Sequence, residues 1–219
     1  MQGRRRAISH LLLALLYFFV VVVLAGVTMI LVSRWLRDAQ GFWLLKQVLP
    51  PALLASVLAL GVWLFDRLRR DNVPRASERL RSLDWIMCAL SGIALFALAI
   101  GIEYALKGSF PDNAVVSTLP PSRFYPYFAC SLVLTGLVQP ILEELVFRGR
   151  LLPLASRAFG VFAGSILVSM PFALLHYSHV LSSFLFSLVL CAVAHRRGIR
   201  ACIVIHASYN VCSILLDAF

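Results

Sequence analysis

The stretch LLLALLYFFVVVVLAGVTMILV, residues 11–32, contains no charged side chain. About twenty consecutive apolar residues are needed to cross the hydrocarbon core of a bilayer as a helix. The stretch is also too long for the apolar segment of a cleaved signal peptide. It therefore predicts an uncleaved membrane-spanning helix, and it indicates that the protein is a membrane protein.

The composition of the chain leads to the same conclusion. Hydrophobic residues make up 61% of the 219 residues and charged residues 14%, whereas soluble domains contain about 45–50% and about 25%. One globule of this size cannot bury so much apolar surface, so lipid must cover the remainder. The composition excludes a secreted disulfide scaffold, a disordered tail and an ordinary cytosolic enzyme.

Further apolar runs follow the first one. They lie at about 44–65, 84–106, 124–143, 159–177, 180–194 and 201–217. The sequence thus predicts an all-α, polytopic integral membrane helix bundle of about seven transmembrane helices, within a range of about six to eight. Because the connections are short, we expect residues 1–219 to form a single transmembrane domain.

The basic residues indicate how this bundle is oriented. The chain has 20 Lys and Arg against 10 Asp and Glu. Its arginines collect before the first apolar run and after the second, fourth and sixth runs, as is typical of cytoplasmic connections. We expect a multi-pass protein of the plasma (inner) membrane with a cytoplasmic N-terminus. Membrane lipid surrounds such a bundle, and the charge pattern does not indicate nucleic acid as a partner.

Ionisable side chains inside membrane spans cost about 2.5–3.5 kcal/mol each on insertion scales, so they usually mark a function. Three places in the second half of the chain carry such groups. In chain order these are Glu143 and Glu144 with Arg148, then His176, then His206 with the polar Asn210.

The first place is the segment EELVFR, residues 143–148. Residues four apart share a face of a helix, so Glu144 and Arg148 can pair. Glu143 points elsewhere and has no local cation, and a desolvated, unpaired carboxylate suits a general base. The alternative is an acidic and basic pair that only marks the end of a helix.

The other two places follow the same four-residue spacing. Phe172 can form one wall of a pocket that holds His176, and His206 lies one turn from Asn210. A buried His and Asn can donate hydrogen bonds to the oxyanion that forms when a peptide carbonyl is attacked. The alternatives are an interfacial histidine and a His–Asn pair that only joins two helices by hydrogen bonds.

Taken together, the three places provide what hydrolysis needs: a base, a partner that orients water, and oxyanion donors. His and carboxylate side chains also bind zinc, but the chain has no HExxH motif. A metal is therefore compatible with these residues but not required by them.

The ordered motifs EExxxR (Glu143, Glu144, Arg148), FxxxH (Phe172, His176) and HxxxN (His206, Asn210) resemble the CAAX protease and bacteriocin-processing family. This family, abbreviated CPBP and also called Abi, includes the eukaryotic type II CAAX prenyl endopeptidase. The FRG segment at residues 147–149 adds to the resemblance. The resemblance covers residues 124–217, whereas residues 1–123 match only as hydrophobic, variable N-terminal helices.

The resemblance implies an intramembrane endopeptidase that hydrolyses a peptide bond of a membrane-associated protein or peptide. By family analogy, Glu143 and His176 activate water, and His206 and Asn210 stabilise the oxyanion. Glu144, Arg148 and Phe172 would support the site.

The family has been described both as metalloproteases and as glutamate-dependent proteases. A metal site would use Glu143, His176 and His206 as ligands. We favour the glutamate scheme, which requires no cofactor, with zinc as the alternative.

Two other functions remain as alternatives. Some relatives are thought to be non-catalytic membrane scaffolds or regulators, or bacteriocin-immunity proteins. A small transporter would also carry buried carboxylates, but the sequence lacks the paired inverted segments typical of that class.

The site poses a problem of depth. If the fourth span ended at Glu143, His176 would lie about 25 Å further across the membrane, at about 1.5 Å per residue, and the two could not meet. We therefore expect the fourth span to continue through residues 145–155. Arg148 and Arg150 would then face a wet cavity or extend to the interface.

The remaining charged residues of the spans have structural interpretations. Glu103 and Lys107 are four apart at a span end and should pair. His179 is a weaker candidate for the site. Asp84 and Asp217 lie at span ends, where water reaches them.

Overall fold

The computed structural model describes residues 81–108 and 120–218 continuously, and before them only scattered positions within 8–60. All regular secondary structure in this part of the chain is helical. The predicted spans at 11–32 and 44–65, and most of the arginine-rich connection that follows them, lie outside the continuously described residues.

The continuously described helices come in three groups. The first is a single helix, α3 (Ser82–Lys107). The second is one unbroken helical rod that contains two π-helical segments: α5 (Pro121–Ser131), η2 (Leu132–Val138), α6 (Gln139–Val146), η3 (Phe147–Leu151) and α7 (Leu152–Phe159). The third group is α8 (Val161–Leu175), the short 3-10 helix η4 (Tyr177–His179), α9 (Val180–Arg197) and α10 (Ile199–Ala218).

Four helical stretches are long and apolar enough to cross a membrane: α3, the 39-residue rod Pro121–Phe159, α9 and α10. Helix α8 is apolar but shorter, with 15 residues. These described residues therefore form a polytopic helical membrane bundle, as predicted.

The predicted end of the fourth span at residue 143 was wrong, whereas the fifth span lies within two residues of its predicted bounds, 159–177. The fourth span does not end at Glu143, because the polar side chains that follow it are buried inside the bundle, so no water-exposed break is needed there. The expected continuation through residues 145–155 is confirmed. The fifth apolar run forms α8, which ends at Leu175.

Two glycines fold the chain back at one end of the bundle. Gly160 joins α7 to α8 with φ 87°, and Gly198 joins α9 to α10 with φ 78°. Only glycine adopts such angles without strain. Because α8 returns along α7, a Cβ atom added to Gly164 would lie 2.7 Å from the backbone nitrogen of Ser156.

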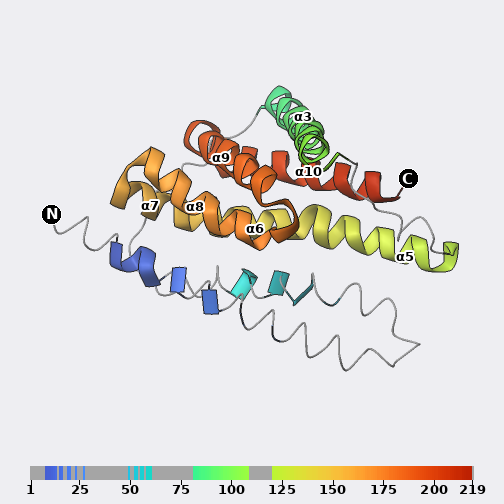
Figure 1. The fold of residues 1–219 in the computed structure, drawn as a ribbon, viewed down its shortest axis with the longest axis horizontal. Helices are drawn as coiled ribbons and strands as arrows, with labels where there is room; N and C mark the ends of the chain where they lie inside the picture. Colours follow the sequence, from blue (N-terminus) through green and yellow to red (C-terminus); the bar gives the residue numbers. More distant parts are fainter. Residues whose placement is uncertain are drawn as a thin grey trace.

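Helix α3 runs alongside α10 (Figure 1). Near their N-terminal ends Arg197 and Asp84 form an ion pair at 2.8 Å. Further along, the rings of Phe96 and Tyr209 meet edge to face, with centroids 5.4 Å apart. The two helices thus run parallel, and Gly92 permits their close approach.

The π-helical segment before α6 has an identifiable local cause. Its register pairs each N–H with the carbonyl five residues earlier, as the bond from Gln139 N to Leu134 O illustrates. The next residue is Pro140, which has no N–H. The carbonyl of Thr135 therefore lacks its partner within the rod, and the side-chain Nδ2 of Asn210 donates to it at 2.9 Å.

Candidate active site

Helix α6 carries two buried carboxylates near the middle of the long rod. Glu143 is 3% exposed and Glu144 is 0% exposed. The predicted pair is present: Arg148 Nη1 lies 2.9 Å from Glu144 Oε1. Both side chains of this pair are fully buried, so the ion pair belongs to the core of the bundle and does not mark a helix end.

A second set of contacts holds Arg148 in place. Its Nη2 donates to Ser187 Oγ at 2.8 Å and to the Ser187 carbonyl at 3.1 Å. Ser187 Oγ donates in turn to Ser169 Oγ at 3.0 Å. The guanidinium also lies 4.7 Å from the ring centroid of Phe172. This network ties the rod to α8 and α9.

His206 lies between the two carboxylates. Its Nδ1 is 2.9 Å from Glu144 Oε1, and its Nε2 is 3.8 Å from Glu143 Oε2. An ionised carboxylate only accepts hydrogen bonds, so Nδ1 of His206 is the donor. The other oxygen of Glu143, Oε1, accepts a hydrogen bond from Gln139 Nε2 at 2.8 Å.

Phe172 separates the two predicted histidines. Its ring stacks on His176 with centroids 4.8 Å apart, and it meets His206 edge-on at 5.8 Å. The predicted aromatic wall beside His176 is therefore present. Nδ1 of His176 lies 2.9 Å from the carbonyl of Phe172, which only accepts. Nδ1 is thus the donor, and a neutral ring has its lone pair on Nε2.

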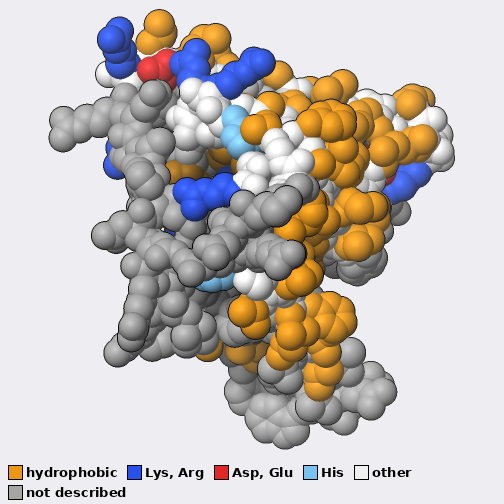
Figure 2. Space-filling view, turned by 90° about the vertical axis from the view of Figure 1, so that its left-hand side faces the viewer, with side chains coloured by type: hydrophobic (Ala, Val, Ile, Leu, Met, Phe, Trp, Pro, Cys, Tyr) orange, Lys and Arg blue, Asp and Glu red, His pale blue; other side chains and the backbone are white. Residues whose placement is uncertain are grey.

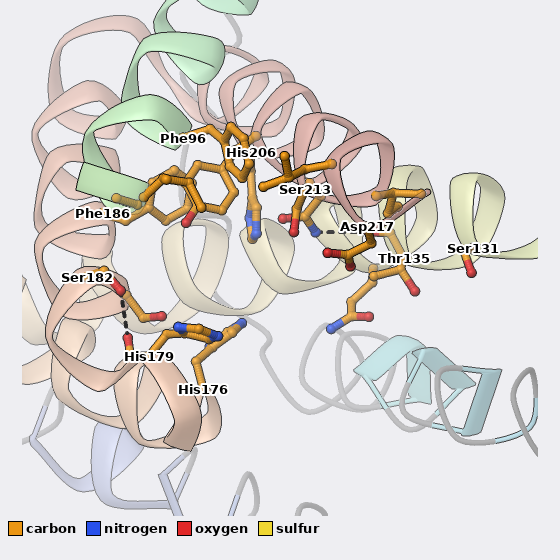
Figure 3. A pocket seen from close by; sticks show the side chains of 18 of the residues that line it. Phe96, Ser131, Thr135, His176, His179, Ser182, Phe186, His206, Ser213 and Asp217 are labelled. Atoms are coloured by element: carbon orange, nitrogen blue, oxygen red, sulfur yellow. Dashed lines mark hydrogen bonds between the residues drawn. The ribbon is translucent and has the colours of Figure 1, made fainter. Parts of the chain in front are cut away.

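A pocket of about 370 Å³ lies beside this cluster. His176, His206 and Asn210 line it, and in Figure 3 His206 points into it from α10, with His176 on the far side. Phe172 of α8 lines it as well, so four predicted site residues from α10 and the C-terminal end of α8 share one cavity. Neither carboxylate of α6 is among the lining residues. Glu143 connects to the pocket only through its neighbours Gln139 and His206, which do line it.

A second polar cluster occupies the other end of the same pocket. Glu103, which is buried, lies 2.6 Å from Lys107 and 3.3 Å from His179, and it accepts a hydrogen bond from Ser182 at 2.7 Å. The predicted Glu103–Lys107 pair is present. Asp217, predicted to lie in water at a helix end, is half-buried and lines the pocket.

The sequence reasoning missed several residues around the site. Gln139 precedes Glu143 by four residues, so the same-face rule could have found it. Ser187 and Thr135 gave no such signal, because their contacts with Arg148 and Asn210 join residues far apart in the chain.

The predicted ligands of a zinc site are Glu143, His176 and His206. Across the described ranges, no group of three or more His, Cys, Asp or Glu side chains is arranged to hold a metal ion. The residues as placed do not fit a three-ligand metal site, and we derive no chemical step through one.

The fold and the site define a helical membrane protein with a buried carboxylate–imidazole–guanidinium cluster next to an internal cavity. The chain matches a family model described as type II CAAX prenyl endopeptidase Rce1-like over residues 125–212. The resemblance predicted from the three motifs is confirmed over these residues, and the family that they match is one of CAAX-type, membrane-embedded proteases. Comparison with curated proteins and with solved structures gives no significant match.

Proposed function

We propose that this protein is an intramembrane endopeptidase that hydrolyses a peptide bond of a membrane-associated protein or peptide. The observation that carries the proposal is His206, which lines the pocket and contacts both buried carboxylates. The match to a protease family supports the same assignment.

The charges of the cluster favour an active base. Glu143 and Glu144 carry two negative charges and Arg148 carries one positive charge, and buried charges are costly unless they are balanced. In the proposed mechanism His206 carries a proton on both ring nitrogens, which balances the charges of the four groups, and Glu143 acts as the base.

The proposed reaction begins with a water molecule in the pocket. Glu143 takes one proton of this water while the water oxygen adds to the carbonyl carbon of the scissile peptide. The lone pair on His176 Nε2 accepts a hydrogen bond from the same water and orients it. For Glu143 to reach the water, the side chain of Gln139 must swing aside.

The next step places negative charge on the former carbonyl oxygen. His206 donates through Nε2–H, and Asn210 donates through the Nδ2 hydrogen that its bond to Thr135 does not use. Collapse of this intermediate restores the carbonyl and breaks the C–N bond. Glu143 then returns its proton to the departing amine, so that atoms and charge balance.

We further propose that the reaction needs no metal, and that the protein is a multi-pass protein of the plasma (inner) membrane with its N-terminus in the cytoplasm. A scaffold, regulator or bacteriocin-immunity role is the second candidate. Two observations favour this second candidate. Neither Glu143 nor Glu144 lines the pocket, and Asn210 already joins α10 to the rod by its hydrogen bond to the Thr135 carbonyl.

The test replaces Glu143 by Gln, which keeps the size and most hydrogen bonds of the side chain. New protein termini are mapped in membranes from cells that express either form. We expect the termini produced by the unmodified protein to disappear, since loss of a general base lowers rates by about 10²–10⁴-fold.

The matched control is Asp84→Asn, which removes the half-buried carboxylate that pairs with Arg197 near the N-terminus of α3, outside the pocket. It should leave the same termini in place. If the Glu143→Gln protein, at equal expression, gives the same termini as the unmodified protein, the protein is not a Glu143-dependent protease and the scaffold role is favoured. Cleavage that stops on chelation and returns with zinc would overturn the metal-free scheme.

A further inference from the structure

The α8–α9 hairpin is short for a membrane hairpin. Helix α8 has 15 residues and is therefore about 22 Å long, against a hydrocarbon core of about 30 Å. The last turn of α8 lies at the same depth as the buried carboxylates, because Phe172 on this turn contacts Phe147 of the rod, with ring centroids 5.1 Å apart. The hairpin thus turns inside the bundle, while the neighbouring helices continue past it.

The pocket occupies the space beyond this turn. The end of α8 and the first turns of α9 line one side of it, and the rest of its lining comes from the C-terminal half of α3, from α5 to α6, and from α10. At its rim the side chains of His179 and Lys107 are 44% and 49% exposed, and Glu103 accepts contacts from both. The pocket therefore reaches the surface on the side of the hairpin turn, away from Gly160 and Gly198.

The two ends of the bundle differ in charge. Five exposed arginines surround the beginning of α3 and the turns at Gly160 and Gly198: Arg81, Arg157, Arg196, Arg197 and Arg200. Figure 2 views the molecule from the α7–α8 end and shows Lys and Arg side chains gathered on this face. At the opposite end, the described residues carry two exposed basic side chains, Lys107 and Arg123.

Arginine-rich connections remain on the cytoplasmic side of a membrane. From the geometry we infer that the pocket opens on the extracytoplasmic side and receives its substrate there. This inference rests on the proposed function. It implies that the substrate is a membrane-anchored chain whose scissile segment lies on the extracytoplasmic face, or a peptide that reaches that face.

The sidedness can be measured with a membrane-impermeant maleimide. The half-buried Cys88, Cys130 and Cys212 are replaced by Ala, and the fully buried Cys191 and Cys202 remain. Single cysteines are then introduced at the pocket end, as Ser178→Cys on the exposed turn and Ser183→Cys in the pocket wall. The matched control at the opposite end is Arg200→Cys.

We expect both pocket-end cysteines to react in right-side-out vesicles and to lose labelling in inverted vesicles. Arg200→Cys should show the reverse pattern, and each variant must label in detergent. Any other pattern, including labelling of Ser178→Cys or Ser183→Cys from the cytoplasmic side, overturns the inference. Labelling requires no proteolysis, so its result is independent of the Glu143→Gln test of the proposed function.

Discussion

At the scale of single residues, the site depends on Arg148. Its guanidinium pairs with Glu144 and also donates a hydrogen bond to Ser187 on α9. Removal of one partner of a buried ion pair leaves the other charge uncompensated, which costs more than removal of both. The Glu144–Arg148 pair should therefore behave as one unit.

This expectation can be tested with Arg148→Met. We expect the free energy of unfolding in detergent micelles to fall by about 3–5 kcal/mol, because Glu144 would remain charged and buried. The double variant Glu144→Gln, Arg148→Met should recover part of this loss. Additive losses in the double variant would contradict the claim that the two side chains act as a unit.

At the scale of helices, the contact between α3 and α10 is set by a small residue. A Cβ atom at Gly92 would lie 2.4 Å from the backbone oxygen of Ile205 and 2.8 Å from Cβ of Ser208. The backbone cannot yield as a flexible side chain would. Because Phe96 of α3 and Tyr209 of α10 both line the pocket, the spacing of these helices also sets the width of the cavity.

Gly92→Ala should therefore force α3 away from α10 and lower the free energy of unfolding by about 1–3 kcal/mol, as overpacked contacts do. Gly101→Ala on the same helix is the matched control, since its Cβ would meet nothing within 4 Å. The unfolding temperatures of the two variants are measured in the same detergent and compared. Equal stabilities would show that the close approach at Gly92 is absent in the membrane protein.

At the scale of the whole molecule, the pocket is where the elements meet. Helices α3, α5, α8, α9 and α10 all contribute to its lining. A bulky side chain placed in this cavity should block a substrate without disturbing the buried ion pair. Such a substitution distinguishes an effect on substrate binding from an effect on the stability of the bundle.

Ser183→Trp tests this point, because Ser183 lines the pocket and is half-buried. We expect cleavage of the endogenous substrate to be lost while the unfolding temperature changes little. Leu185→Trp, at an exposed position on the same helix, is the control and should retain cleavage. Retained cleavage by the Ser183→Trp protein would exclude the pocket as the site of substrate binding.

The sequence by itself determined the membrane class of the protein and the contacts within single helices. Glu144 meets Arg148, Phe172 stacks on His176, and Glu103 pairs with Lys107, because residues four apart on a helix share a face. The resemblance to the protease family also came from these short motifs.

Only the tertiary structure decided how the helices meet. It placed His206 between the two carboxylates, brought Ser187 to Arg148, and kept Glu143 off the pocket wall, with Gln139 hydrogen-bonded to it. It also placed the end of the fourth span at Phe159, four residues beyond the continuation through residue 155 that the sequence predicted. Contacts between helices depend on how the helices cross and on their relative depth, and the spacing of residues along one helix specifies neither.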